Sequence, residues 1–463
     1  MAKKSKKINM LNYRNKYLYS HTPKKRNKTN KKYNIRNMRL KITQTKSLAG
    51  RPIAAGGFGC VFKPALTCKK YPKYKKYQKN YVSKLMLNRY ADEEMSIINN
   101  FLPYIRNIKN YKDYFLIDDI YSCQPASLKS KDLKDFNKTC KNFGSYDKNN
   151  INDNIGDFKI INALDGGIDL DIYWNKWNNL KMGHLSQKLI KNKLFYSTNN
   201  SLIKLLNKGI IPMNSTGIYH LDIKGSNILR SLNNNNIYNI KDVKTRIIDW
   251  GLAMYKPNNV ISLDAYKSRI LLNRPFQFNL PFSNILLQTN IQEDIDFFIS
   301  NYFNQTQTTT YDNTRNIICE NLAIYLYDNA IIKLGDGHIN YMIGLLNMIY
   351  KPIMNNLDIN HVNIEKNIII DYNKKVLDKY LDSKYKFNIE KYINEVFLKN
   401  VDIWGFIMSY TDIISLKNPW TNKLQSKICN ILIKYCFHPR YSINIIPISE
   451  LTNDLIKLNQ IKI

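Results

Sequence analysis

Four side chains with complementary chemistry lie close together in the sequence. Asp222, Lys224 and Asn227 closely follow His220, and Asp249 begins an Asp-x-Gly triplet a short distance downstream. A carboxylate can accept the proton of a hydroxyl group and a lysine can neutralise a phosphate, while an amide and a second carboxylate offer the oxygen ligands that Mg²⁺ prefers. Phosphoryl transfer requires this set of groups, because the reaction depends mainly on positioning and charge neutralisation.

The order and spacing of these residues resemble those of the protein-kinase superfamily. His220-Leu-Asp222-Ile-Lys224-Gly-Ser-Asn227 is similar to the kinase catalytic loop, and Asp249-Trp-Gly to the metal-binding triplet. The resemblance implies that Asp222 is the catalytic base, that Lys224 steadies the γ-phosphate of ATP, and that Asn227 and Asp249 hold Mg²⁺. Abundant Asn, Ile, Lys and Tyr, together with variants of the kinase motifs, make the chain resemble the divergent Ser/Thr protein kinases of giant DNA viruses.

A glycine-rich segment upstream is typical of a hairpin that covers nucleotide phosphates. Gly56 and Gly59 match the second and third glycines of the kinase pattern, and Ala54 stands where the first is expected. Because alanine is small, we expect a stiffer loop that still binds nucleotide. Ordinary hairpins share this spacing, so the interpretation depends on the other motifs. The predicted contact residues are Ile53, Ala54, Ala55, Gly56, Gly57, Phe58, Gly59, Cys60 and Val61.

Lys84 lies in an apolar run of strand length, and a helical segment follows it. It resembles the kinase strand lysine that contacts the ATP phosphates and pairs with a helix glutamate. Glu94 has Ile97 and Ile98 at i+3 and i+4, so it lies beside an apolar helix face. We therefore expect Glu94, rather than Glu93, to pair with Lys84.

Two further segments resemble kinase elements. Residues 158–170 are similar to the strand and hinge that bind adenine. On this register the backbone groups from Asn162 to Leu164 would contact the adenine ring. An ordinary strand followed by a turn remains the alternative there. Asp402 resembles the helix aspartate that braces the backbone of the catalytic loop.

The chain also departs from the kinase pattern. Leu221 replaces the arginine that usually binds a phosphate on the activation segment, so we expect activity that does not depend on phosphorylation there. The sequence contains no clear Ala-Pro-Glu motif, and residues 274–282, with two prolines, are predicted to form a rigid docking loop instead. A mainly helical insertion is expected at about 283–400, with helices around 292–303, 316–332 and 338–355.

The resemblance implies an α+β, bilobal protein-kinase-like fold. A small lobe with an antiparallel sheet is expected at 47–163, interrupted by a basic insertion at 67–80 and a polar insertion at 125–157. A large, mainly helical lobe is expected at 164–463. The length of 463 residues and a hydrophobic content of 44% suffice for such a core.

Positive charge is concentrated at the N-terminus. The first 91 residues contain 26 lysines and arginines and no acidic residue, so they carry most of the formal net charge of +34. Residues 1–46, with few apolar side chains, are predicted to form a disordered polybasic arm. A solvated tail, an arm that binds nucleic acid or an acidic partner, and a localisation signal are the three interpretations.

The seven cysteines form no Cys-x-x-Cys pair, which favours reduced intracellular thiols over a disulfide framework or a zinc site. We expect Cys60 to be a free bystander thiol and Cys429 and Cys436 to lie in the core. The N-terminus is too charged for a secretory signal, and no apolar run is long enough for a membrane span. An intracellular protein, in host cytoplasm or virion if viral, is expected.

The motifs favour a Ser/Thr protein kinase that uses ATP and Mg²⁺, since Lys224 lies two residues after the base. A kinase of small molecules or lipids is the first alternative, because of the helical insertion and the missing Ala-Pro-Glu. A pseudokinase scaffold is less favoured, since every charged catalytic position is filled. A basic nucleic-acid-binding protein that uses the same fold is the fourth possibility.

Overall fold

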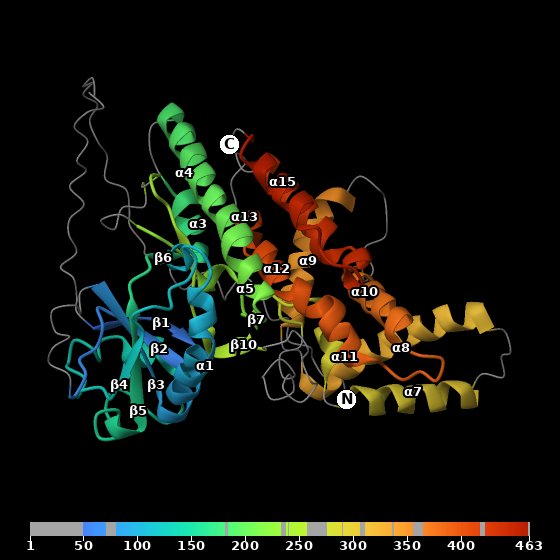
Figure 1. Ribbon diagram of the computed structural model, residues 1–463, viewed down its shortest axis with the longest axis horizontal. Helices are drawn as coiled ribbons and strands as arrows, with labels where there is room; N and C mark the ends of the chain where they lie inside the picture. Colours follow the sequence, from blue (N-terminus) through green and yellow to red (C-terminus); the bar gives the residue numbers. More distant parts are fainter. Residues whose placement is uncertain are drawn as a thin grey trace, which may run out of the picture. The chain divides into compact units, whose positions relative to one another are not determined.

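The computed structural model describes the following residues: 50–70, 80–180, 184–232, 238, 240–256, 276–288, 290–305, 311–335, 338–354, 364–416 and 422–461 (Figure 1). The chain divides into two units, Met1–Ser47 and Leu48–Ile463, and the first lies outside the described residues. The predicted arm at 1–46 and its partners therefore stay predictions. Most of the basic insertion at 67–80 and the first two residues of the docking loop also lie outside.

A five-stranded antiparallel sheet forms the N-terminal part of the second unit, in the order β1-β2-β3-β5-β4 (Figure 1). Its register places Lys84 of β3 opposite Val61 of β2 and Ile161 of β5. Helix α1 (Asn88–Arg106) follows β3 directly and packs beside β3 and β5. The strands are β1 (Arg51–Gly56), β2 (Gly59–Lys63), β3 (Tyr81–Leu87), β4 (Tyr121–Cys123) and β5 (Phe158–Leu164).

The two faces of this sheet pack against different partners, because successive side chains of a strand point to opposite sides. Met86 and Ile161 pack with Ala91 of α1 on one face, which is also the face of Lys84. The opposite face, here called the back face, carries a second set of buried residues: Cys60, Phe62, Leu85, Phe158, Ile160, Ser83 and Asn162.

Residues 125–157, here called the cap, cover the back face. They include helix α2 (Phe136–Thr139) and bury Leu128, Phe143 and Ile151 against the sheet. One disulfide, Cys60–Cys140, joins the sheet to the cap, and a second, Cys68–Cys123, joins the segment after β2 to β4; their Cα–Cα distances are 5.3 and 5.8 Å. The expectation of seven reduced cysteines is therefore wrong for these four, because the fold brings together pairs that are 80 and 55 residues apart.

The remaining described residues are mainly helical and share one continuous core. Buried aromatic side chains from distant segments meet in it, including Trp174 of α3, Trp250 and Trp404 of α12. Cys429 and Cys436 are buried there as expected. The helices of this part are α3 (Leu170–Asn178), α4 (His184–Leu205), α5 (Ile211–Ser215), α12 (Leu398–Met408), α13 (Thr411–Ile414), α14 (Asn422–Leu432) and α15 (Ile448–Leu458).

The expected helices of the insertion are present. They are α7 (Ile291–Gln305), α8 (Tyr311–Leu334) and α9 (Ile339–Met354), and α10 (Ile364–Tyr380) and α11 (Ile389–Tyr392) follow them (Figure 1). α10 packs along α8 and against the short helical segment Phe282–Leu287. In the described ranges, no helix combines the length and the apolar character that crossing a bilayer would need.

Candidate functional site

A short hairpin brings the two predicted metal ligands to the same place. Strand β8 (Ile228–Arg230) pairs with β9 (Thr245–Ile247), and Ile228 lies opposite Ile247. The amide of Ile248 donates to the carbonyl oxygen of Asn227 at 3.0 Å, which extends the ladder by one step. Asn227 and Asp249 therefore leave the hairpin at the same end. The register achieves this although 22 positions separate the two residues in the sequence.

Lys84 lies between two carboxylates. Its Nζ atom is 2.8 Å from Oε2 of Glu94 and 2.7 Å from Oδ1 of Asp249. The predicted pairing with Glu94 is confirmed, since Glu94 is buried on α1 whereas Glu93 is exposed. Burial opposes the charge of Lys84, but the two carboxylates outweigh it and raise its pKa. Burial likewise opposes ionisation of Asp249, and Lys84 reverses this and lowers the pKa of Asp249.

The carboxylate of Asp222 accepts hydrogen bonds from three side chains. Lys224 Nζ lies 3.0 Å from Oδ2, Asn227 Nδ2 donates to Oδ2 at 3.0 Å, and Asn279 Nδ2 donates to Oδ1 at 3.0 Å. The Asp222 side chain is largely buried. A neutral amide donor for Asp222 in the segment 276–282 was not anticipated, because nothing local in the sequence distinguishes Asn279 from the many other asparagines.

The backbone around Asp222 is held by a buried carboxylate, as the resemblance implied. Asp402 of α12 accepts hydrogen bonds from the amides of His220 and Leu221, both at 2.8 Å. Leu221 has a φ of 61°, a left-handed conformation that costs a non-glycine residue of order 1 kcal/mol. The two bonds from Asp402 offset this strain. The ring of His220 also bonds to the carbonyl oxygen of Ile248, which links the loop to Asp249.

The glycine hairpin forms as predicted, with β1 and β2 joined by the two-residue turn Gly57–Phe58. A side chain at Gly59 would lie 2.6 Å from the carbonyl oxygen of Leu85, so packing on β3 requires glycine there. A side chain at Gly56 or Gly57 would meet nothing within 4 Å, so these two glycines leave open space instead. Ile53, Ala54 and Ala55 are exposed, as residues that contact a ligand must be before it binds.

One predicted nucleotide contact, Cys60, lies differently from expectation. Cys60 is fully buried on the back face and bonded to Cys140, so it is neither a free thiol nor placed toward a nucleotide under the hairpin. Neighbouring side chains of a strand point to opposite faces of the sheet. Because Val61 lies on the face of Lys84, the side chain of Cys60 lies on the back face. The side chain of Asn162 is also on the back face, where its Oδ1 accepts from Ser83 at 2.5 Å. Leu164 ends β5 opposite Tyr81, and the predicted backbone contacts with adenine stay a prediction.

A pair of carboxyl groups lies against the loop of residues 220–227. A side chain at Gly225 would meet Oδ1 of Asp171 at 1.9 Å and Oδ2 of Asp412 at 2.9 Å. Burial, together with the hydrogen bond and repulsion between the two carboxyls, raises the pKa of Asp171 to about 8. Burial and the neighbouring Asp412 thus favour the protonated form of Asp171, and glycine at 225 leaves the two carboxyl groups the necessary space.

This pair should make stability depend on pH. Because the pKa of Asp171 is raised above its ordinary value of 3.8, the folded protein binds a proton that the unfolded chain releases, and stability should fall as pH rises from about 4 to about 8. Asp171→Asn should flatten this slope, and Asp412→Asn should do the same. Urea unfolding midpoints measured across this pH range test the prediction, and an unchanged slope in both variants would contradict it.

A scan against models of known protein families finds no match for this chain, and no curated protein is significantly similar to it.

Proposed function

We propose that the protein transfers the γ-phosphoryl group of ATP, with Mg²⁺, to Ser/Thr hydroxyls of a protein substrate. The observation that carries this proposal is the arrangement around the β8–β9 hairpin. At one end of it lie a buried carboxylate with a lysine beside it, Asp222 and Lys224, and a second carboxylate paired with a strand lysine, Asp249 and Lys84. These are a proton acceptor and the charges that phosphoryl transfer requires.

In this proposal Asp222 accepts the proton of the acceptor hydroxyl as its oxygen attacks the γ-phosphorus, and the bond from that phosphorus to the β,γ-bridging oxygen breaks to release ADP. Lys224, 3.0 Å from Asp222, lies where it can neutralise charge that develops on the transferred group. Asn227 and Asn279 each donate to one oxygen of Asp222 and so hold the carboxylate in a single orientation. Lys84, held by Glu94, provides a fixed positive charge for the other phosphates.

The residues present suit Mg²⁺, which when bound would neutralise phosphate oxygens. Asp249 and the amide oxygen of Asn227 are the hard oxygen donors that this ion takes, and they leave the hairpin together. Asp249 stays ionised, since Lys84 lowers its pKa, and its side chain is 36% exposed. The open space above Gly56 and Gly57 suits phosphates, and the 53% exposed Ile53 offers an apolar surface to a base.

The order of the elements supports a bilobal kinase-like fold with a small lobe at 47–163 and a large lobe at 164–463. The expected small lobe has an antiparallel sheet and a helix, and the five-stranded antiparallel sheet with α1 between β3 and β4 in the sequence agrees with it. The lysine of β3, the glutamate of α1 and the aspartate after β9 meet as that fold demands.

The position of Asn279 leads to a kinetic prediction. Asn279→Ala removes one donor from a buried carboxylate and so loosens the orientation of Asp222, and kcat should fall about tenfold with KM for ATP unchanged. Steady-state kcat and KM for ATP, measured for both proteins, test this prediction. A kcat within about two-fold of wild type would contradict the role given to Asn279.

A kinase of small molecules is the second candidate, and one contact favours it. Tyr341 of α9 packs its ring on Phe278, with centroids 5.3 Å apart, and Phe278 is next to Asn279. The helical insertion therefore lies near Asp222, where the substrate that receives the phosphate would bind. There it would restrict the space for a polypeptide.

The experiment that separates these candidates is transfer of radiolabelled γ-phosphate from ATP in the presence of Mg²⁺. Acidic and basic generic proteins, the chain itself, and mixtures of small hydroxyl compounds serve as acceptors. Label on serine or threonine supports the proposal, and label only on small molecules supports the second candidate. If ATP neither binds nor is consumed, the chain is not a kinase.

A further inference from the structure

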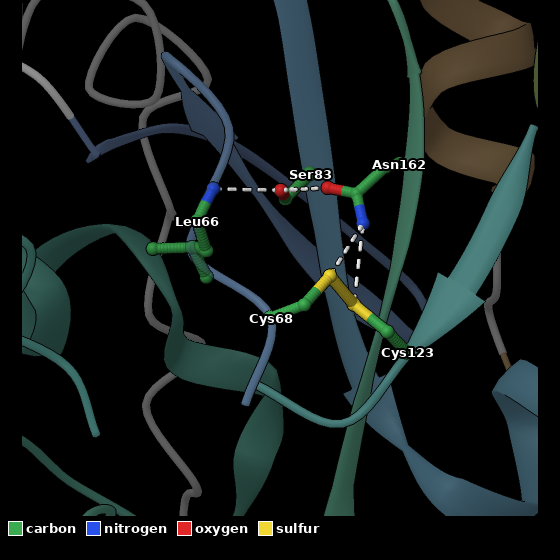
Figure 2. Close-up of a disulfide and its surroundings, with 5 residues drawn as sticks. All are labelled: Leu66, Cys68, Ser83, Cys123 and Asn162. Carbon is green, nitrogen blue, oxygen red and sulfur yellow. Dashed lines mark hydrogen bonds between the residues drawn. A yellow bond between two sulfur atoms is a disulfide. The ribbon is translucent and has the colours of Figure 1, made fainter. Parts of the chain in front are cut away.

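Both disulfides of the structure lie on the back face, and one of them joins the sheet to the cap while the other joins the segment after β2 to β4. Cys60 of β2 is bonded to Cys140 of the cap. Cys68, in the segment after β2, is bonded to Cys123 at the end of β4, two residues before the cap begins (Figure 2). The other three cysteines, Cys319, Cys429 and Cys436, are free and buried elsewhere. The four paired cysteines are therefore concentrated in one small part of the fold.

The cap contacts the glycine hairpin directly. Asn142, two residues after Cys140, donates from Nδ2 to the carbonyl oxygen of Gly56 at 2.5 Å. Cys60 itself lies opposite Ala55 in the β1–β2 ladder. A covalent bond and a hydrogen bond thus attach the cap to the two strands that flank the turn. Movement of the cap would change the position of this hairpin.

The second disulfide is coupled to β3 and β5 through buried polar groups (Figure 2). Asn162 Nδ2 donates to both sulfurs, at 3.8 Å for Cys68 and 3.6 Å for Cys123. Its Oδ1 accepts from Ser83, whose hydroxyl oxygen in turn accepts from the amide of Leu66 at 2.7 Å. Ser83 directly precedes Lys84, so this network extends from the disulfide to the strand that carries the lysine.

We propose that the two disulfides make the small sheet redox-responsive: oxidation holds the cap on the back face and fixes the glycine hairpin for nucleotide binding, and reduction loosens both. The part that concerns nucleotide rests on the proposed function. Cross-links between residues 80 and 55 positions apart restrict the unfolded chain strongly, so their loss should lower stability markedly. A hairpin that is less ordered before binding should also bind ATP more weakly.

The exposure of the four cysteines predicts which disulfide reacts first. Cys60 and Cys140 are 0% and 3% exposed, whereas Cys68 is half-buried. A thiolate of a dithiol reductant therefore attacks Sγ of Cys68, and Cys123 leaves as a thiolate that takes up a proton. The second thiol of the reductant then displaces Cys68. The protein disulfide gains two electrons and two protons, and the reductant becomes a cyclic disulfide.

The test compares the full chain, purified without reductant, with the same protein after treatment with dithiothreitol and with protein that is then reoxidised. Alkylation under denaturing conditions should label three cysteines in the oxidised state and seven in the reduced state. Reduction should lower Tm by about 5–10 °C. It should weaken ATP–Mg²⁺ binding about tenfold, and reoxidation should restore both. This comparison requires no substitution, so it does not depend on a variant that folds.

Variants then identify the bonds responsible. Cys123→Ser with Cys140→Ser in one chain should behave like reduced wild type and be indifferent to dithiothreitol. Cys319→Ala removes a buried free thiol, and its response to dithiothreitol should match that of wild type. Seven labelled cysteines in the untreated protein, or equal ATP affinity in both states, would overturn the proposal. If neither state binds ATP, the proposed function fails, and the Tm difference alone decides whether the sheet responds to reduction.

Discussion

Asp222→Asn is expected to lower the rate of γ-phosphoryl transfer by about 10³-fold while leaving ATP binding nearly unchanged. The substitution keeps the size of the side chain but removes the carboxylate that is proposed to accept the hydroxyl proton. The amides of Asn227 and Asn279 both donate toward this position, so an asparagine here also loses part of its hydrogen bonding. Single-turnover transfer measured beside equilibrium ATP binding separates the two effects.

Asp153→Asn is the matched control, because Asp153 is an exposed aspartate in the cap. This variant should transfer phosphate at the wild-type rate. An Asp222→Asn protein that is folded, binds ATP and still turns over within a few-fold of wild type would exclude Asp222 as the base and remove the main support for the proposed reaction.

Lys84→Met is expected to abolish most transfer and also to destabilise the fold, by about 2 kcal/mol at neutral pH. The side chains of Lys84, Glu94 and Asp249 are 19%, 8% and 36% exposed, so the loss of the lysine leaves the buried carboxylate of Glu94 beside that of Asp249 without a cation. The pKa of Glu94 is already raised by burial, and Asp249 adds to this. Without Lys84, Glu94 should take up a proton on acidification, and the loss of stability should shrink as pH falls below neutrality.

A double variant and a matched control sharpen this experiment. Lys84→Met with Glu94→Gln removes one of the two carboxylate charges, so part of the stability should return while transfer stays lost. Lys159→Met is the control on β5, because Lys159 forms an exposed ion pair with Asp92. This variant should lose less than about 1 kcal/mol of unfolding free energy. Urea unfolding and transfer assays supply both readouts. Equal destabilisation by Lys84→Met and Lys159→Met would contradict the described arrangement.

Part of this architecture could be predicted from the sequence because it depends on local periodicity. The apolar spacing after Glu94 identified the face of α1 that is buried, and the pairing with Lys84 followed from it. Long periodic segments likewise predicted α7, α8 and α9 within a few residues. The backbone contacts of Asp402 were anticipated from the resemblance alone, since no local pattern connects α12 to the catalytic loop.

Only the tertiary structure decided the long-range pairs. Asn279 and Asp222 are 57 residues apart, and the cysteine pairs are 80 and 55 residues apart, so no spacing rule connects them. Strand alternation in β2 could have placed Cys60 opposite the face of Val61. What it could not show is that the cap would fold over that face and bring Cys140 there. The sequence thus determined the long helices and the strand that carries Lys84, because these depend on neighbouring residues, and it supplied the motifs on which the proposed chemistry rests. The packing of the cap and of the segment 276–282 determined the partners of Cys60 and Asp222, because such contacts depend on how distant segments fill the same space.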